Sequence, residues 1–105
     1  MSVHELARSI GSSRLITDPA VMDSYRRDEA HLAEPGHPAA VMLAETAADI
    51  SEALKWATAH RVPVVTRGAG TGLAGGGVAV EGCLVISTTR MRSILEVNPD
   101  DQLAV

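Results

Sequence analysis

The sequence predicts a mixed α/β (α+β) fold, built on a βαβ unit with extra strands. Three patterns support this fold class: an apolar run at residues 39–44, an amphipathic helical pattern at residues 46–60, and a β-branched run at residues 62–66. A strand, a helix and a strand in this order favour two parallel strands joined by a right-handed crossover. We expect the loop after the second strand to lie at the edge of the sheet where open α/β folds bind their ligands.

Residues 1–36 predict a helical segment and a loop, ahead of a main unit at residues 37–105. Ser2 and Glu5 have the spacing of a capping box, and the apolar residues that follow lie on one helical face as far as Ile10. A glycine comes next, so a short amphipathic helix should end there.

A second short helix is expected to begin at Asp18, with Pro19 in its first turn, and to end near Tyr25. Residues 26–38 then carry charges, histidine, proline and glycine without a helical or strand period. We expect this segment to be a loop that leads into the main unit.

The helix of the βαβ unit should begin at Thr46, with Asp49 three residues on, and end near His60. A positive charge on His60 would suit the negative end of the helix dipole. Trp56 lies outside the predicted core stripe, and we expect it at the edge of the helix interface or against a further segment. The stripe has four apolar positions at helical spacing: Ile50, Ala53, Leu54 and Ala57.

Further strands are expected after the glycine-rich segment. Residues 83–87 predict a third strand, in which Cys83 should be a buried structural thiol. Residues 93–97 and 102–105 predict a hairpin, since Asn98-Pro99 suits the start of a type I turn. The chain stops inside this hairpin, so we expect a fragment of a longer protein whose exposed edge strand favours self-association.

Composition argues against several kinds of partner. The net charge is −4 and no basic run is present, which disfavours nucleic acid and anionic membranes. One Tyr, one Trp and no Phe leave no stacking platform for single strands. The sequence shows neither a signal peptide nor an apolar run long enough to span a membrane. We therefore expect a cytoplasmic protein, with peripheral membrane association as a further expectation for a full-length form.

The titratable residues outside the glycine-rich segment are interpreted as structural. The histidines show no metal-ligand spacing. Asp28 and Glu29, followed by His31, are a combination used in acid–base chemistry, but we expect exposed loop charges, because a polar loop without buried neighbours shifts no pKa. Arg90 and Arg92 are expected in a solvated turn rather than facing a ligand.

The most informative segment is the glycine-rich run RGAGTGLAGGG at residues 67–77, which holds six of the nine glycines of the chain. Such a concentration is typical of backbone that adopts positive φ angles or approaches a ligand closely. Apart from Arg67, no side chain in the run is suited to chemistry. The run should therefore bind through backbone N–H groups, which suit an anion such as phosphate.

Two common phosphate-binding motifs do not fit this run. Gly70, Gly72 and Gly75 satisfy the G-x-G-x-x-G spacing, but that motif needs a helix that begins at the loop. Three adjacent glycines at residues 75–77 disfavour a helix by roughly 1 kcal/mol each relative to alanine. A P-loop is excluded because no Lys-Ser/Thr pair follows the glycines. An extended strand–loop–strand anion cradle remains.

Residues 63–76, PVVTRGAGTGLAGG, resemble the flavin pyrophosphate loop of the FAD-linked oxidase family, the vanillyl-alcohol-oxidase-like group with the PCMH-type FAD domain. Within that family, the likeness is greatest to the branch of the glycolate oxidase D-subunit and D-lactate dehydrogenase. The resemblance covers roughly residues 20 to 105 and implies the N-terminal subdomain of a PCMH-type FAD-binding domain. Its flanks agree at His37-Pro38, 46–60, 84–87 and 91–97.

The resemblance implies that backbone N–H groups of this loop hold the diphosphate of FAD. Thr71 can add a hydroxyl donor, and Arg67 either adds charge or pins the loop by bonds to backbone. Family members that attach FAD covalently through histidine carry that histidine at the position of Thr71, so we expect non-covalent FAD. The expected cofactor-binding residues are Arg67, Gly68, Ala69, Gly70, Thr71, Gly72 and Leu73.

The resemblance also implies the FAD-binding portion of a flavin-dependent oxidoreductase that oxidises a 2-hydroxy acid such as glycolate or D-lactate. In such relatives, hydride passes from the substrate α-carbon to the flavin. The catalytic residues of the family lie beyond residue 105, so we expect none in this chain and no activity from it alone. The alternative is a non-catalytic, truncated nucleotide-binding or interaction module.

Overall fold

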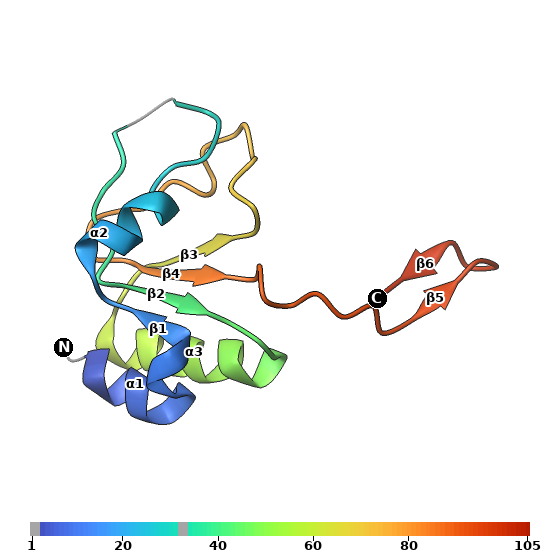
Figure 1. The fold of residues 1–105 in the computed structure, drawn as a ribbon, viewed down its shortest axis with the longest axis horizontal. Coiled ribbons are helices and arrows are strands. Elements are labelled where there is room, and N and C mark those ends of the chain that lie inside the picture. Colours follow the sequence, from blue (N-terminus) through green and yellow to red (C-terminus); the bar gives the residue numbers. More distant parts are fainter. Residues whose placement is uncertain (1–2, 32–33) are drawn as a thin grey trace.

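The computed structural model describes residues 3–31 and 34–105 and has a four-stranded sheet at its centre (Figure 1). β4 (Leu84–Ser87) pairs in parallel with β2 (Ala40–Leu43) and with β3 (Val64–Arg67). β1 (Leu15–Ile16) pairs antiparallel with β2. The predicted α/β fold class and the parallel strands of the βαβ unit are confirmed. Across the sheet, the order is β1, β2, β4 and β3.

The sheet departs from the simplest βαβ arrangement in two ways. β4 lies between β2 and β3, so the two strands that flank the helix do not pair with each other. All residues of β2 and β4 are buried, whereas β3 is partly exposed, and the most apolar strands therefore occupy the centre. The edge strand β1 is absent from the sequence prediction, because two residues cannot show an alternating pattern.

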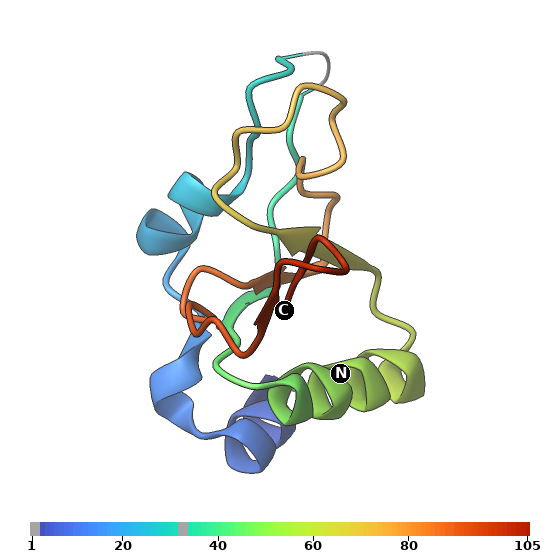
Figure 2. The same cartoon turned by 90° about the vertical axis from the view of Figure 1, so that its right-hand side faces the viewer.

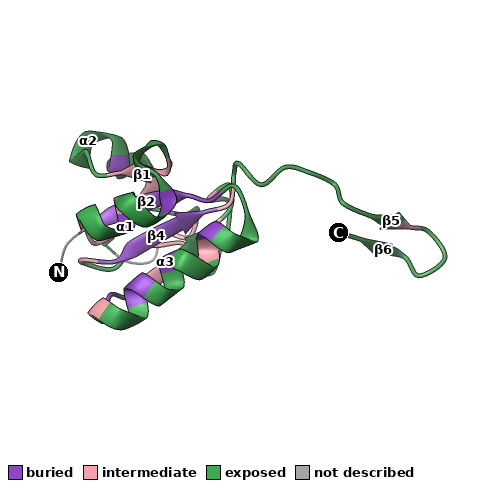
Figure 3. Cartoon of the chain, turned by 90° about the horizontal axis from the view of Figure 1, so that it is seen from below, coloured by how far each residue is buried: buried purple, intermediate pink, exposed green. Residues whose placement is uncertain are grey.

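Both faces of the sheet are covered. α1 (Val3–Ile10) and α3 (Ala47–His60) lie on one face, and α2 (Pro19–Met22) lies on the other (Figures 1 and 3). Successive side chains of a strand point to opposite faces, so β2 and β4 contribute to two separate cores. The core under α1 and α3 includes Leu6, Ile10, Met42, Trp56, Leu84 and Ile86, and the opposite core includes Met22, Val41, Leu43, Ala79, Cys83 and Val85.

The buried face of α3 is rotated relative to the predicted stripe. Leu54 is 44% exposed, so its assignment to the core was wrong, whereas Trp56 is only 8% exposed and packs in the core. An indole buries more apolar surface than a leucine side chain, and here it also stacks on His60 with ring centroids 5.1 Å apart. His60 Nε2 lies 3.0 Å from Glu5 Oε2, which joins the end of α3 to α1.

The N-terminal helices begin largely as predicted. α1 covers Val3–Ile10, while the expected cap at Ser2 lies outside the described residues. Asp18 caps α2, since its Oδ1 accepts a hydrogen bond from the backbone N–H of Ala20 at 2.9 Å. α2 ends at Met22, and a 3-10 turn continues over Asp23–Tyr25. No helix in the described part of the chain is long and apolar enough to cross a membrane.

The predicted hairpin is confirmed with shorter strands, β5 (Val97–Asn98) and β6 (Leu103–Ala104). The Asn98 side chain accepts a hydrogen bond from the backbone N–H of Asp101 at 3.1 Å, which closes the turn. The hairpin extends away from the sheet and exposes most of its residues (Figures 1 and 3).

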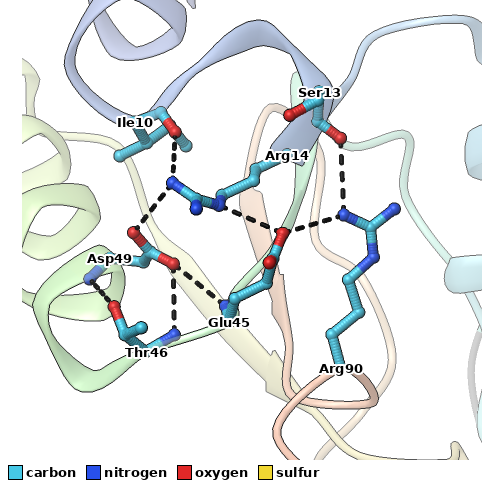
Figure 4. A network of polar contacts seen from close by, with 7 residues as sticks. All are labelled: Ile10, Ser13, Arg14, Glu45, Thr46, Asp49 and Arg90. Atoms are coloured by element: carbon cyan, nitrogen blue, oxygen red, sulfur yellow. Dashed lines mark hydrogen bonds and ion pairs between the residues drawn. The ribbon is translucent and has the colours of Figure 1, made fainter.

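A polar network joins the N-terminal segment, the start of α3 and the turn after β4 (Figure 4). Glu45 Oε2 lies 3.1 Å from Arg14 Nε and 3.2 Å from Arg90 Nη1. Asp49 accepts hydrogen bonds from the backbone N–H groups of Glu45 and Thr46 at 3.0 and 3.1 Å, and it pairs with Arg14 at 3.4 Å. Arg90 lies exposed in a turn, as predicted, and it also pairs with Glu45.

Thr46 and Asp49 form the predicted capping box at the start of α3, because Thr46 Oγ1 in turn accepts from the Asp49 backbone N–H at 3.2 Å. Burial by itself raises the pKa of Asp49. The two backbone hydrogen bonds and the positive charge of Arg14 outweigh burial, so the pKa lies below its ordinary value.

We expect Asp49→Asn to lower the free energy of unfolding by about 1–2 kcal/mol at pH 7, since the amide loses the charge that these donors stabilise. A depressed folded-state pKa contributes stability above the unfolded-state pKa and loses it as pH falls through the folded-state value. The difference between variant and wild type should therefore shrink below about pH 4. Urea denaturation at pH 7 and pH 3 measures this, with exposed Glu52→Gln as the control. A difference that does not change with pH would contradict the ionic role.

Candidate functional site

The glycine loop, which we define as residues 68–77, leaves the carboxyl end of β3. It lies beside a second loop, defined as residues 24–31 and 34–36, and Figures 1 and 2 show the two loops next to each other beyond the sheet. The backbone N–H of Thr88, just after β4, donates to the Arg67 carbonyl at 3.0 Å. The sheet thus fixes the point at which the glycine loop begins.

The glycine loop has a backbone rich in unused donors. No N–H group of residues 68–77 donates a hydrogen bond to another residue that the structure describes. Gly70 and Gly75 adopt positive φ angles of 76° and 82°, which favour glycine. The remaining glycines of the loop do not, and of these Gly72 and Gly77 lie close to Asp28. A row of free amide donors is what an anion cradle requires.

Backbone hydrogen bonds hold the two loops together. The N–H of Glu29 donates to the carbonyl of Gly72 at 3.0 Å, and the N–H of Ala79 donates to the carbonyl of Arg26 at 2.9 Å. Gly36 donates to Ala79 at 2.8 Å. We call these three hydrogen bonds the clasp. The sequence could not predict the clasp, because bonds between backbone groups carry no signature in residue type.

Arg67 holds the second loop rather than pointing freely toward a ligand. Its guanidinium donates to the backbone carbonyls of Arg27 and, at 3.4 Å, of Ser24, and it lies over the Tyr25 ring with its Cζ 5.9 Å from the centroid. From the sequence, Arg67 could either add charge to the site or pin the loop by bonds to backbone. These contacts favour the second role.

Asp28 corrects one expectation of the sequence analysis. Its residue exposure is 5%, whereas Glu29 and His31 remain in the exposed positions expected for loop charges. Asp28 Oδ1 accepts a hydrogen bond from the Ala30 backbone N–H at 2.9 Å, but its buried Oδ2 has no partner among the described residues. The glycine loop folds over Asp28, and the sequence could not show this because the two segments lie about 45 residues apart.

The glycine loop and Asp28 line a cavity of about 330 Å³. Besides Asp28, its wall consists of residues 66–74, Gly76 and Gly77, so it includes every sequence-predicted site residue from Arg67 to Leu73. The described residues contain no cluster of metal-ligating side chains. Cys83 is buried, and burial raises the pKa of its thiol, as expected for a structural cysteine. The arrangement can bind an anion but offers no nucleophile or acid–base pair.

Comparison with known proteins relates the chain to a family of cofactor-binding domains. The sequence profile of a family described as "FAD binding domain" matches residues 38–105. An uncharacterised FAD-linked oxidoreductase of Mycobacterium tuberculosis is 38% identical over 91% of this chain. D-2-hydroxyglutarate dehydrogenase of Xanthomonas citri is 36% identical over 92% of it, and D-lactate dehydrogenase of Archaeoglobus fulgidus is 38% identical over 79%. The chain spans about a fifth of these relatives, namely 21%, 20% and 19%.

The fold has solved counterparts as well. The solved structure of 4-ethylphenol oxidase from Gulosibacter chungangensis superposes with a TM-score of 0.79 over 93% of this chain and 20% of that protein, at 22% identity. At this identity the likeness concerns the fold.

We expect Gly70→Ala to destabilise the chain by about 1–3 kcal/mol, because a methyl group there meets the Arg67 guanidinium and the positive φ angle adds strain. Gly68→Ala is the matched control, since a methyl group at Gly68 meets nothing within 4 Å and φ is not positive. Chemical denaturation of both variants measures the difference. Equal stability of the two variants would show that Gly70 has no special backbone role.

Proposed function

The chain belongs to the family of FAD-binding domains of FAD-linked oxidoreductases, and on this premise we propose that its glycine loop holds the diphosphate of FAD through backbone N–H groups. The observation that carries the proposal is the row of unused amide donors at residues 68–77, which lines a cavity and starts at the carboxyl edge of a parallel sheet. The residues present therefore fit a bound diphosphate.

Individual residues of the site receive distinct roles. Gly68, Gly70 and Gly72 allow the backbone to approach the phosphate oxygens, and the Thr71 hydroxyl adds a donor. Arg67 holds the cradle in place through its bonds to the second loop. Since Thr71 stands where covalent family members carry histidine, the proposed flavin is held without a covalent bond.

For the whole protein, we propose a cytoplasmic oxidoreductase that oxidises a 2-hydroxy acid such as glycolate or D-lactate. The names of the relatives, which include dehydrogenases of D-lactate and D-2-hydroxyglutarate, support this substrate class. When bound, the flavin supplies the redox chemistry that no side chain of this chain provides. The contribution of residues 3–31 and 34–105 is to bind and orient that cofactor.

A second candidate, an interaction module, is favoured by the hairpin. Ile94, Leu95 and Val97 are 77%, 77% and 67% exposed, and Leu103 and Val105 also expose apolar surface. Such a patch on an extended hairpin with an open edge is suited to pairing with another chain.

We expect FAD to bind the 105-residue chain with a dissociation constant weaker than 1 μM, because a cavity of 330 Å³ cannot enclose a dinucleotide. Two-dimensional NMR titration should shift the amide signals of residues 67–73, and acid precipitation of the complex should release all flavin. Calorimetry that gives submicromolar affinity would contradict the expected weakness. Loop signals that do not respond to millimolar FAD would overturn the proposed function.

Self-association through β6 is expected at high protein concentration. Analytical ultracentrifugation should show a concentration-dependent dimer, and Leu103→Lys should reduce it, since a charge on an edge strand opposes pairing. Exposed Val80→Lys, which lies outside the hairpin, is the control. A strictly monomeric wild type at millimolar concentration would remove the support for this interaction.

A further inference from the structure

We propose that Asp28 is a ligand-contacting residue of the glycine-loop cavity, whose carboxylate accepts a hydrogen bond from a sugar hydroxyl next to the bound phosphate. This inference rests on the proposed function and adds a recognition element to it. The backbone cradle would then bind the phosphate, and Asp28 would select ligands in which a polyol or ribose is attached.

The Asp28 side chain is buried and only half satisfied by hydrogen bonds. The residue is 95% buried, yet only Oδ1 has a hydrogen-bond partner, the backbone N–H of Ala30. Oδ2 is buried without a partner in the described part of the chain. A buried oxygen without a donor is costly, and because Asp28 lines the cavity, a hydrogen-bond donor from a ligand would offset this cost.

The unpaired Oδ2 of Asp28 lies under the glycine loop. A methyl group built on Gly72 would lie 3.9 Å from Asp28 Oδ2, and one on Gly77 would lie 3.5 Å from Asp28 Cβ. Glycine at both positions lets the loop backbone lie close to Asp28, whose Oδ2 is buried. The bond from Glu29 to Gly72 holds the neighbouring backbone in place, so Asp28 is fixed against the cavity it lines.

The negative charge of a carboxylate limits which group of a ligand can lie against Asp28. A carboxylate repels a phosphate, so an inorganic anion alone would leave Oδ2 unpaired and add repulsion. Arg67, a possible source of compensating charge, already donates to the carbonyls of Arg27 and Ser24. A hydroxyl group supplies the missing donor without a second negative charge. In a flavin dinucleotide, hydroxyls flank the diphosphate on both sides, as ribose and as ribityl.

The test compares three ligands on the 105-residue chain by NMR titration at millimolar concentration: inorganic pyrophosphate, ADP and FMN. Asp28→Asn keeps the shape of the side chain and removes its charge. We expect the variant to bind ADP, FMN or both about tenfold more weakly, as loss of a charge-assisted hydrogen bond predicts, while pyrophosphate binds equally well or more tightly. Glu52→Gln, which removes an exposed negative charge on α3 from a residue outside the cavity wall, should change none of the three affinities.

The outcomes separate the inference from the function on which it rests. A loss confined to ADP assigns the ribose as the partner, and a loss confined to FMN assigns the ribityl chain. An equal loss for all three ligands would show that Asp28 only organises the loop, and unchanged affinities would show that it makes no contact. Either result overturns the inference while the proposed function stands. Failure of wild type to bind any of the three overturns both.

A second measurement covers the case in which Asp28→Asn does not fold, as judged by its amide spectrum. Wild type is then titrated with counterparts of ADP and FMN whose sugar hydroxyls are replaced by hydrogen. We expect at least one of them to bind about tenfold more weakly than its parent ligand. Equal affinities for both pairs would overturn the inference.

Discussion

The pairing of β4 with both β2 and β3 is the constraint on which the other features of this structure depend. The central strands are buried on both faces, so their register is fixed by two cores at once. Their parallel direction brings all three carboxyl ends to the same edge. That edge carries the start of α3 with its Asp49 network, the turn after β4, and the glycine loop. Because β4 pairs with both β2 and β3, these three segments lie at one edge of the same sheet.

The clasp between the two loops holds the glycine loop in place at this edge of the sheet. Glycine-rich backbone gains no order from side-chain packing, and its conformational entropy opposes a single shape. Here the hydrogen bonds from Glu29 to Gly72 and from Ala79 to Arg26 hold the backbone of the glycine loop in one shape. The Arg67 guanidinium adds a charged donor to the second loop. The loop keeps its own N–H groups free, because the clasp uses its carbonyls and flanking residues. A loop whose backbone is held in place and whose N–H groups remain unpaired is suited to bind an anion.

Charge is distributed differently in the two polar clusters. Near α3, Asp49 and Glu45 are matched by arginines and backbone donors, so that cluster is complete within the chain. Under the glycine loop, Asp28 is buried with one oxygen unpaired. The first pattern is that of a structural network, and the second is the pattern on which the proposed contact with a sugar hydroxyl rests. Both lie on the same molecule, and residue type alone does not distinguish them.

The sequence by itself determined the fold class, the capping box at Thr46, the hairpin and the family, because periodicity, cap chemistry and the glycine run are local signals. It did not determine that Trp56 rather than Leu54 enters the core, since the rotation of α3 depends on how α1 packs beside it. Nor did it show the edge strand β1, the central place of β4 or the burial of Asp28. Each of these results from contacts between segments distant in the chain, and only the tertiary structure decides which backbone covers which side chain.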